Sequence, residues 1–367
     1  MYRAWGGNYA VSRSDWSDTA VEVTLLGGPV VGSIGNGKPQ FNSGSITIQR
    51  GNNRLLVYGI GEASRAYDII SHTTFYNQFP SECQPGNKKN SIFWAGASLS
   101  ETANQGYHTR ALPPGYTDTV AAWGSSIDRA EDTTFYTYWR ASGLEANNDK
   151  SAIDKKYHQV AWTREVFFLR PKLVIVHDRT TVLNNGDDRA MFWVFGRNIS
   201  AVTNGVSSGV TRYDAAYQGV YRGAFWSVLP AAPSSVSVVD HDDLHFLYRV
   251  EVRPAANDHR NDNWLVVLDA ADSVQNVNTV TPLTATNADS VQFNDTNRTV
   301  VAFPQSDPPT LPMTIQLTGQ TQVYVAGMSA STNYKITASS TSVTISADDG
   351  THRVASSATG ILAILNQ

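Results

Sequence analysis

Apolar and polar residues alternate with a period of two along much of the chain, which is the pattern of β-strands with one wet face. Two clear examples are Ser45 to Gln49 (SITIQ) and Phe246 to Val252 (FLYRVEV). Helical periodicity is nearly absent, and the one helical turn that we predict lies around Glu62 to Ile70. The pattern therefore predicts an all-β protein.

Two continuous apolar runs interrupt this alternation. Val166 to Leu169 and Leu173 to Val176 consist of apolar residues only, and Arg170-Pro171-Lys172 separates them. Such runs are typical of strands that are covered on both faces, and the separating residues favour a turn. We therefore predict a β-sandwich in which these two strands lie centrally.

Residues that tolerate positive φ punctuate the predicted strands. Turns are predicted at Arg50 to Asn53, at Asn184 to Asp187 and at Asp348 to Gly350, each between strand candidates. We expect hairpins and meanders to follow from them.

A proline-rich stretch suggests a boundary near the C-terminus. Residues 305–312 contain three prolines in eight residues, which disfavours a central strand. Beyond it, short strands are predicted at 323–328, 334–337, 343–345 and 360–365. We predict a large β-sandwich domain over 1–305 and a small C-terminal β module over 306–367.

Composition narrows the class of protein. The chain has 28 Lys and Arg against 32 Asp and Glu, a net charge of -4. This balance argues against a general positive field that would hold nucleic acid. Charged residues are only 16% of the chain, as in extracellular or envelope β proteins. The single cysteine, Cys83, excludes an intrachain disulfide and is interpreted as a packing residue.

Hydropathy indicates no membrane span. The N-terminal residues lack a basic start followed by an apolar stretch, and no run of about 18 apolar residues occurs in the chain. We expect an extracellular, periplasmic or cell-envelope protein whose leader is not part of this sequence.

Several side chains could bind or process a sugar acid. Tyr107, His108 and Arg110 lie close together before the Pro113 to Gly115 turn, in what we expect to be an exposed loop. Arg65 and Tyr76 belong to a mixed aromatic and arginine region that could stack on a sugar and clamp its carboxylate. The alternatives are a solvated loop and ordinary packing.

Two histidine-containing motifs are interpreted as structural. His241 and His245 would lie about 13 Å apart on an extended strand, too far for one metal ion unless the chain turns. His177-Asp178 is interpreted as a strand-end turn in which Asp178 accepts backbone hydrogen bonds. The sequence contains no glycine-rich phosphate loop and no Gly-x-Ser-x-Gly elbow, which argues against a nucleotide-binding protein and against a serine hydrolase.

Seven segments, spread in order over most of the chain, together resemble one known family. They are residues 12–17, 42–51, 55–59, 164–179, 225–231, 248–254 and 264–268. Their order and spacing are similar to those of the C-terminal β region of the heparinase II/III-like polysaccharide lyases. This resemblance implies that residues 1–305 form a two-layer antiparallel β-supersandwich, which in the family packs against an N-terminal helical toroid and lines a cleft for acidic polysaccharides.

The resemblance also implies where the reaction centre and its metal would be. Eliminative cleavage of a uronate chain needs a neutralised carboxylate, an abstracted proton and a protonated leaving oxygen. The family's two histidines, one catalytic and one a zinc ligand, match positions in Lys38 to Asn42, and its zinc-binding aspartate matches Tyr58. Only His72 keeps a zinc-binding side chain, so we expect neither a structural zinc ion nor a cofactor.

Two hypotheses follow, from different classes. In the first, the chain is a polysaccharide lyase or its β-domain portion, and a separate polypeptide supplies the toroid or the β domain acts alone. The candidate catalytic residues are His72, Tyr76, Tyr107 and His108, and the candidate substrate-binding residues are Lys38, Gln40, Asn42, Arg65 and Arg110. In the second, the chain is a non-catalytic carbohydrate-binding or surface-structural β-sandwich of the same lineage.

Overall fold

The chain folds as an all-β protein. The computed structural model describes residues 2–5, 9–26, 46–51, 53–56, 75–77, 125–148, 157–182, 189–195, 201–207, 210–217, 220–230, 236–240, 248–252, 254, 256, 258–319 and 321–366. Over these ranges, the only helical element is a 3₁₀ turn, Val274–Asn276. The predicted fold class is confirmed, while the helical turn predicted around 62–70 and Cys83 lie outside the described residues.

The strands form four sheets. The nine-stranded sheet has the order β1 (Tyr2–Trp5), β2 (Tyr9–Arg13), β3 (Val21–Leu26), β4 (Ile46–Arg50), β5 (Asn53–Leu56), β11 (Arg189–Phe195), β16 (Tyr248–Val252) and β15 (Val236–Asp240), with β6 (Phe75–Asn77) also paired to β11. The eight-stranded sheet has the order β12 (Ala201–Ser207), β13 (Val210–Tyr217), β14 (Val220–Leu229), β17 (Asn261–Asp269), β10 (Leu173–Val182), β9 (Tyr157–Leu169), β8 (Tyr136–Asn148) and β7 (Ser125–Asp132).

Two five-stranded sheets come from the C-terminal part of the chain. The inner one has the order β18 (Val280–Pro282), β20 (Ala288–Phe293), β21 (Val300–Pro304), β23 (Thr321–Val325) and β27 (Leu362–Asn366). The outer one has the order β19 (Ala285–Thr286), β22 (Met313–Gln316), β25 (Ser342–Ala347), β24 (Asn333–Ala338) and β26 (Arg353–Ala355). Among the described pairings, β21 with β23 is the parallel one and the others are antiparallel.

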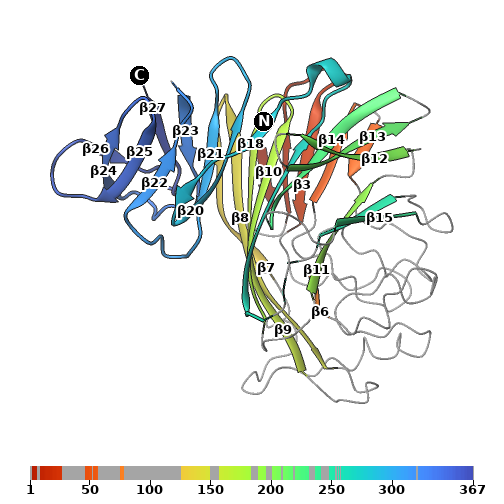
Figure 1. Ribbon diagram of the computed structural model, residues 1–367, viewed down its shortest axis with the longest axis horizontal. Coiled ribbons are helices and arrows are strands. Elements are labelled where there is room, and N and C mark those ends of the chain that lie inside the picture. Colours follow the sequence, from red (N-terminus) through yellow and green to blue (C-terminus); the bar gives the residue numbers. More distant parts are fainter. Residues whose placement is uncertain are drawn as a thin grey trace.

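The sheets are stacked as four layers, because three separate apolar cores lie between them. The first core joins the nine-stranded and eight-stranded sheets, the second joins the eight-stranded and inner five-stranded sheets, and the third joins the two five-stranded sheets. In Figure 1 the five-stranded sheets, in blue, lie to the left of the long strands β8 and β9. The eight-stranded sheet is therefore covered on both faces.

The two continuous apolar runs form the expected central strands. Val166 and Phe168 of β9 point into the first core, whereas Phe167 and Leu169 point into the second. The chain turns at 170–172, where the backbone N–H of Arg170 donates to the carbonyl of Phe135. These runs are apolar throughout because each face of the sheet meets another layer.

Most of the described turn predictions are confirmed. Gly51 has a φ of 53° between β4 and β5, and Gly350 has a φ of 92° between β25 and β26. The turn predicted at 184–187 lies outside the described residues. Residues 305–312 contain no strand, as predicted, and the boundary predicted at 305/306 follows β21, while the division into two domains stays a prediction.

Candidate functional site

Only one of the nine predicted site residues lies within the described part of the chain. Tyr76 belongs to β6, where it pairs with Ala190 of β11. The other eight lie outside the described residues: Lys38, Gln40, Asn42, Arg65, His72, Tyr107, His108 and Arg110. The structure does describe the strands that precede and follow these residues along the chain.

The nine residues lie on β6 or on three connections that are flanked by described strands. The connection 27–45 joins β3 to β4, the connection 57–74 joins β5 to β6, and the connection 78–124 joins β6 to β7. The positions of Leu26, Ile46, Leu56, Phe75, Asn77 and Ser125 therefore decide where each connection begins and ends.

Register places the first two pairs of strand ends together in the nine-stranded sheet. Leu56 pairs with Phe195 of β11, and Phe75 pairs with Met191 of the same strand, so β5 and β6 lie in line along one edge of β11. Ile46 lies beyond Ile48, which pairs with Leu56, in the direction of β6. By strand rise and spacing, Ile46 is on the order of 10 Å from the start of β6.

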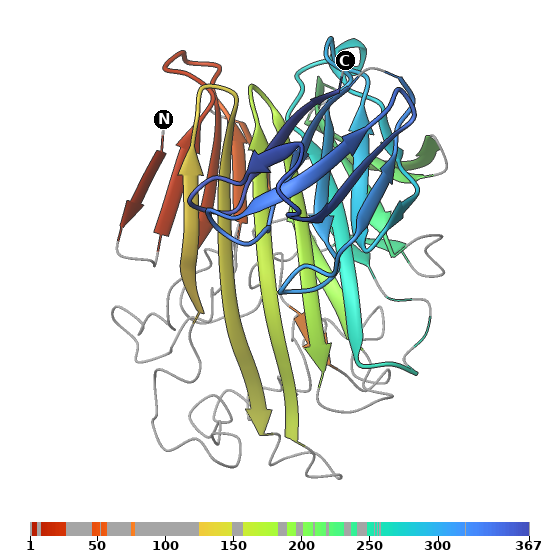
Figure 2. The same ribbon diagram turned by 90° about the vertical axis from the view of Figure 1, so that its left-hand side faces the viewer.

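The eight-stranded sheet points its matching ends the same way. Ser125, the first residue of β7, pairs with Gly143 of β8, far along β8 from Thr137. β6 contacts β9 across the sandwich, and Figures 1 and 2 show β6 and the far ends of β8 and β9 in the lower part of the molecule. All three connections therefore leave the sandwich at one end, which we call the open end.

The opposite end of the sandwich is held together by polar contacts between the two sheets. Ser12 of β2 and Thr137 of β8 share a hydrogen bond of 2.7 Å. The Arg170 side chain donates to the backbone carbonyl of Arg13, and Arg50 donates to that of Ala270 at 2.7 Å. These contacts hold the two sheets together at this end of the sandwich, which we call the tied end.

Beneath β11 lies a buried ion pair. Arg164 of β9 donates from Nε and Nη2 to both carboxylate oxygens of Asp178 on β10, at 2.6 and 2.7 Å, and the two side chains are 0% and 1% exposed. Its guanidinium also lies 5.5 Å from the ring centroid of Trp193 and 3.7 Å from Sδ of Met191. The pair thus supports the strand to which β6 is paired.

The prediction for His177-Asp178 was wrong. Both residues lie inside β10 rather than at a strand end, and both are fully buried on opposite faces of the sheet. Asp178 accepts from the Arg164 side chain instead of from a turn backbone. The sequence did carry a signal, since charged residues stand beside the apolar runs at Arg164-Glu165 and His177-Asp178, where only buried partners could accommodate them.

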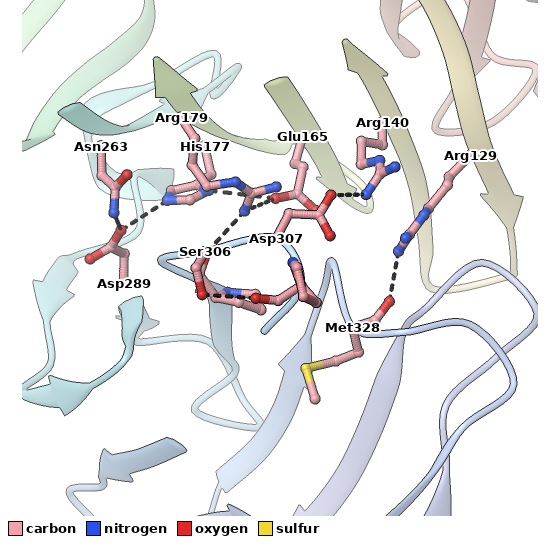
Figure 3. Close-up of polar contacts among 12 residues, drawn as sticks. Arg129, Arg140, Glu165, His177, Arg179, Asn263, Asp289, Ser306, Asp307 and Met328 are labelled. Atoms are coloured by element: carbon pink, nitrogen blue, oxygen red, sulfur yellow. Dashed lines mark hydrogen bonds and ion pairs between the residues drawn. The ribbon is translucent and has the colours of Figure 1, made fainter. Parts of the chain in front are cut away.

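A second group of buried polar residues lies between the eight-stranded and inner five-stranded sheets. We call Glu165, His177, Arg179 and Asp289 the interlayer cluster (Figure 3). Glu165 and His177 are 0% exposed and Asp289 is 7% exposed. Sequence reasoning missed this group, because Asp289 comes from β20, more than a hundred residues after β10.

Each member of the interlayer cluster has at least one short polar contact, while His177 Nδ1 makes no hydrogen bond to the described residues. His177 Nε2 lies 2.9 Å from Asp289 Oδ2, and its Nδ1 lies 3.6 Å from Glu165 Oε2. Arg179 Nη1 lies 2.7 Å from the same Glu165 oxygen and donates to the carbonyl of Pro304 at 2.9 Å. Glu165 Oε1 accepts from the Tyr138 hydroxyl at 2.6 Å.

These contacts shift the protonation equilibria. Burial would raise the pKa of Glu165, but Arg179, His177 and Tyr138 outweigh it and lower the pKa to about 2. Asp289 is likewise held below its ordinary pKa, because hydrogen bonds from His177, Gln305 and Asn263 outweigh its burial. Glu165 and His177 at its centre are sealed from solvent, so the cluster links two layers rather than offering a surface to a substrate.

The described residues offer no site for a metal ion. Searched over these ranges, the structure contains no group of three or more His, Cys, Asp and Glu side chains that could hold one. His241 and His245 lie outside the described residues. Within the same ranges, no helix is long and apolar enough to span a bilayer.

Comparison with solved structures identifies similar folds. A mutant of heparan sulfate lyase HepC from Pedobacter heparinus matches 83% of this chain and 43% of its own, with a TM-score of 0.53 and 12% identity. A heparinase III gene product with methylated lysines matches 82% of this chain and 40% of its own, with a TM-score of 0.49 and 10% identity. No protein-family model and no curated protein matches the chain.

The HepC structure confirms the resemblance seen in the sequence at the level of fold. The chain spans less than half the length of the solved structures it matches, so the likeness concerns a β portion of those lyases. At this identity the likeness is one of architecture, and fold alone does not fix function.

Proposed function

We propose that the chain is the β-domain portion of a polysaccharide-lyase-type protein and that its open end binds a uronic-acid-containing polysaccharide. One observation carries this proposal: the strands that flank all nine candidate residues end at the same end of the sandwich. Loops on a rigid β scaffold are a common location for binding and catalytic groups. The fold shared with a heparan sulfate lyase supports the reaction class.

In this proposal the candidate residues divide by chemistry. Lys38, Gln40, Asn42, Arg65 and Arg110 bind the substrate carboxylate, since cationic and amide donors neutralise it. His72, Tyr76, Tyr107 and His108 are the candidates for proton transfer, because imidazole and phenol groups can abstract and return protons. A helical domain or subunit completes the cleft, and the protein acts outside the cell or in the envelope.

The test combines binding with product formation. The purified chain is run through gels that contain an acidic or a neutral polysaccharide, and the unsaturated uronate product is followed by its ultraviolet absorbance. We expect retardation by the acidic polysaccharide and product formation that falls by about 10²–10⁴-fold in Tyr76→Phe or His72→Gln. His352→Gln, in the exposed bend just before β26, is the matched control and should behave as the parent chain does.

The outcomes separate the two hypotheses. If the acidic polysaccharide retards the chain but no unsaturated product forms, the second hypothesis, a non-catalytic carbohydrate-binding protein, is favoured. Product formation that is unchanged in both variants contradicts the assignment of Tyr76 and His72. If the acidic polysaccharide does not retard the chain and no unsaturated product forms, the proposal as a whole is contradicted.

A further inference from the structure

An imidazole with a carboxylate near each ring nitrogen is stabilised in its charged form by both carboxylates. Neutral histidine donates from a single nitrogen, whereas the imidazolium donates from both. His177 has Asp289 at Nε2 and Glu165 at Nδ1, and all three side chains are buried. In its charged form His177 would donate a hydrogen bond to Asp289 at 2.9 Å and would lie in ion-pair contact with Glu165 at 3.6 Å.

The two carboxylates belong to different layers. Glu165 lies on β9 of the eight-stranded sheet and Asp289 lies on β20 of the inner five-stranded sheet (Figure 3). His177 thus joins the layers through its own charge. We propose that the interlayer cluster is a protonation-dependent clamp that holds the C-terminal sheets against the sandwich and weakens when His177 loses its second proton.

Among the described groups that surround His177 on the eight-stranded sheet, a second cation compensates Glu165 but none compensates Asp289. Arg179, on the same face of β10, pairs with Glu165 and so compensates that carboxylate. Asn263 of β17 donates to Asp289 Oδ2 at 2.9 Å and is neutral. Asp178 points into the other layer, where Arg164 neutralises it.

The groups from the inner five-stranded sheet leave Asp289 dependent on His177. Gln305, just after β21, donates to Asp289 Oδ1 at 2.7 Å, and the ring of Phe303 stacks on the imidazole at 4.9 Å between centroids. Neither group carries a charge. When His177 is neutral, the buried Asp289 carboxylate keeps hydrogen bonds but loses the cation that it contacts.

The direction of the pKa shifts agrees with this clamp. Burial and Arg179 lower the pKa of His177, but Asp289 and Glu165 outweigh them, so the pKa is raised above its ordinary value. A raised pKa contributes stability that is complete below about pH 6.5 and is lost as the pH rises through the folded-state value. The lowered pKa values of Glu165 and Asp289 contribute stability above about pH 4.5 that is lost on further acidification.

Histidine titration by NMR tests the protonation state directly. In the full chain with labelled histidine, the His177 resonance is assigned by its absence in His177→Gln. We expect it to titrate above the ordinary value of about 6.5 and to shift downward in Asp289→Asn, which removes one carboxylate. A His177 resonance that titrates below the ordinary value would overturn the proposal.

Hydrogen exchange tests the mechanical consequence in the parent chain. Between about pH 5.5 and about pH 9, the protection factors of β20 and β21 amides should fall several-fold relative to those of β3 and β4, as His177 loses its proton. This pH-dependent difference should be absent in Asp289→Asn. His259→Gln is the matched control, because His259 also lies between two carboxylates, Asp258 and Asp262, but is 44% exposed. Equal pH dependence in the two sets of strands, or an unchanged difference in Asp289→Asn, would overturn the clamp.

Discussion

At the scale of the residue, buried charged side chains in this protein lie in contact with an opposite charge. Arg164 and Asp178 form a bidentate pair with almost no exposure, and the guanidinium also faces the Trp193 ring. Such a pair contributes little net stability compared with apolar residues, but removing one partner leaves an uncompensated buried charge. The effect of a substitution on stability thus depends on the partner of the residue that is removed.

Asp178→Ala should therefore lower the free energy of unfolding by about 3–5 kcal/mol. Urea denaturation followed by tryptophan fluorescence measures this change. Asp349→Ala is the control, because Asp349 pairs with Lys335 on the surface, where solvent screens the interaction, and it should change stability little. A similar effect of both substitutions would contradict the buried-charge explanation.

At the scale of the element, a single strand of the eight-stranded sheet serves two cores. Phe167 and Phe168 are neighbours in β9, are both 0% exposed and point to opposite faces. Side chains alternate across a strand, so adjacent substitutions act on different layers. This arrangement explains why a continuous apolar run was needed here.

Phe167→Ala and Phe168→Ala form a matched pair of tests. Each should lower the free energy of unfolding by about 3–5 kcal/mol, because each leaves a cavity in a packed core. Hydrogen exchange should locate the losses: Phe167→Ala should speed exchange in β20 and β21, whereas Phe168→Ala should speed it in β3 and β4. The same exchange pattern in both variants would show that the layers do not respond separately.

At the scale of the whole molecule, the two ends of the sandwich differ in construction. One end is tied by Arg170, Arg50 and the pair of Ser12 and Thr137, while three connections leave from the other. Sheets that are tied at one end and carry connections at the other are the arrangement expected of a binding scaffold.

A bound acidic polysaccharide should therefore protect the open end. Hydrogen exchange with and without the polysaccharide should show slower exchange at residues 24–26 and 75–77, because these strand ends flank the candidate connections. Amides at 12–14, 170 and 172, at the tied end, are the internal control and should not change. Protection at the tied end alone would place the ligand elsewhere and contradict the proposed binding region.

Local chemistry along the chain was enough to predict the fold class, the turns at Gly51 and Gly350, and the doubly covered strands at 166–169 and 173–176. These features depend on side-chain alternation and on glycine conformations, which act over a few residues. The resemblance to the heparinase II/III-like β region likewise followed from the order of short segments, and the fold comparison supports it.

Only the tertiary structure decided which distant residues meet. His177 and Asp178 read as a turn in sequence, yet β10 continues through them, because Arg164, Glu165 and Asp289 supply the partners that allow their burial. The common end of the three candidate connections likewise depends on the pairing of β5 and β6 with β11. Long-range pairing is not encoded in any short pattern, since it depends on packing between layers that are far apart along the chain.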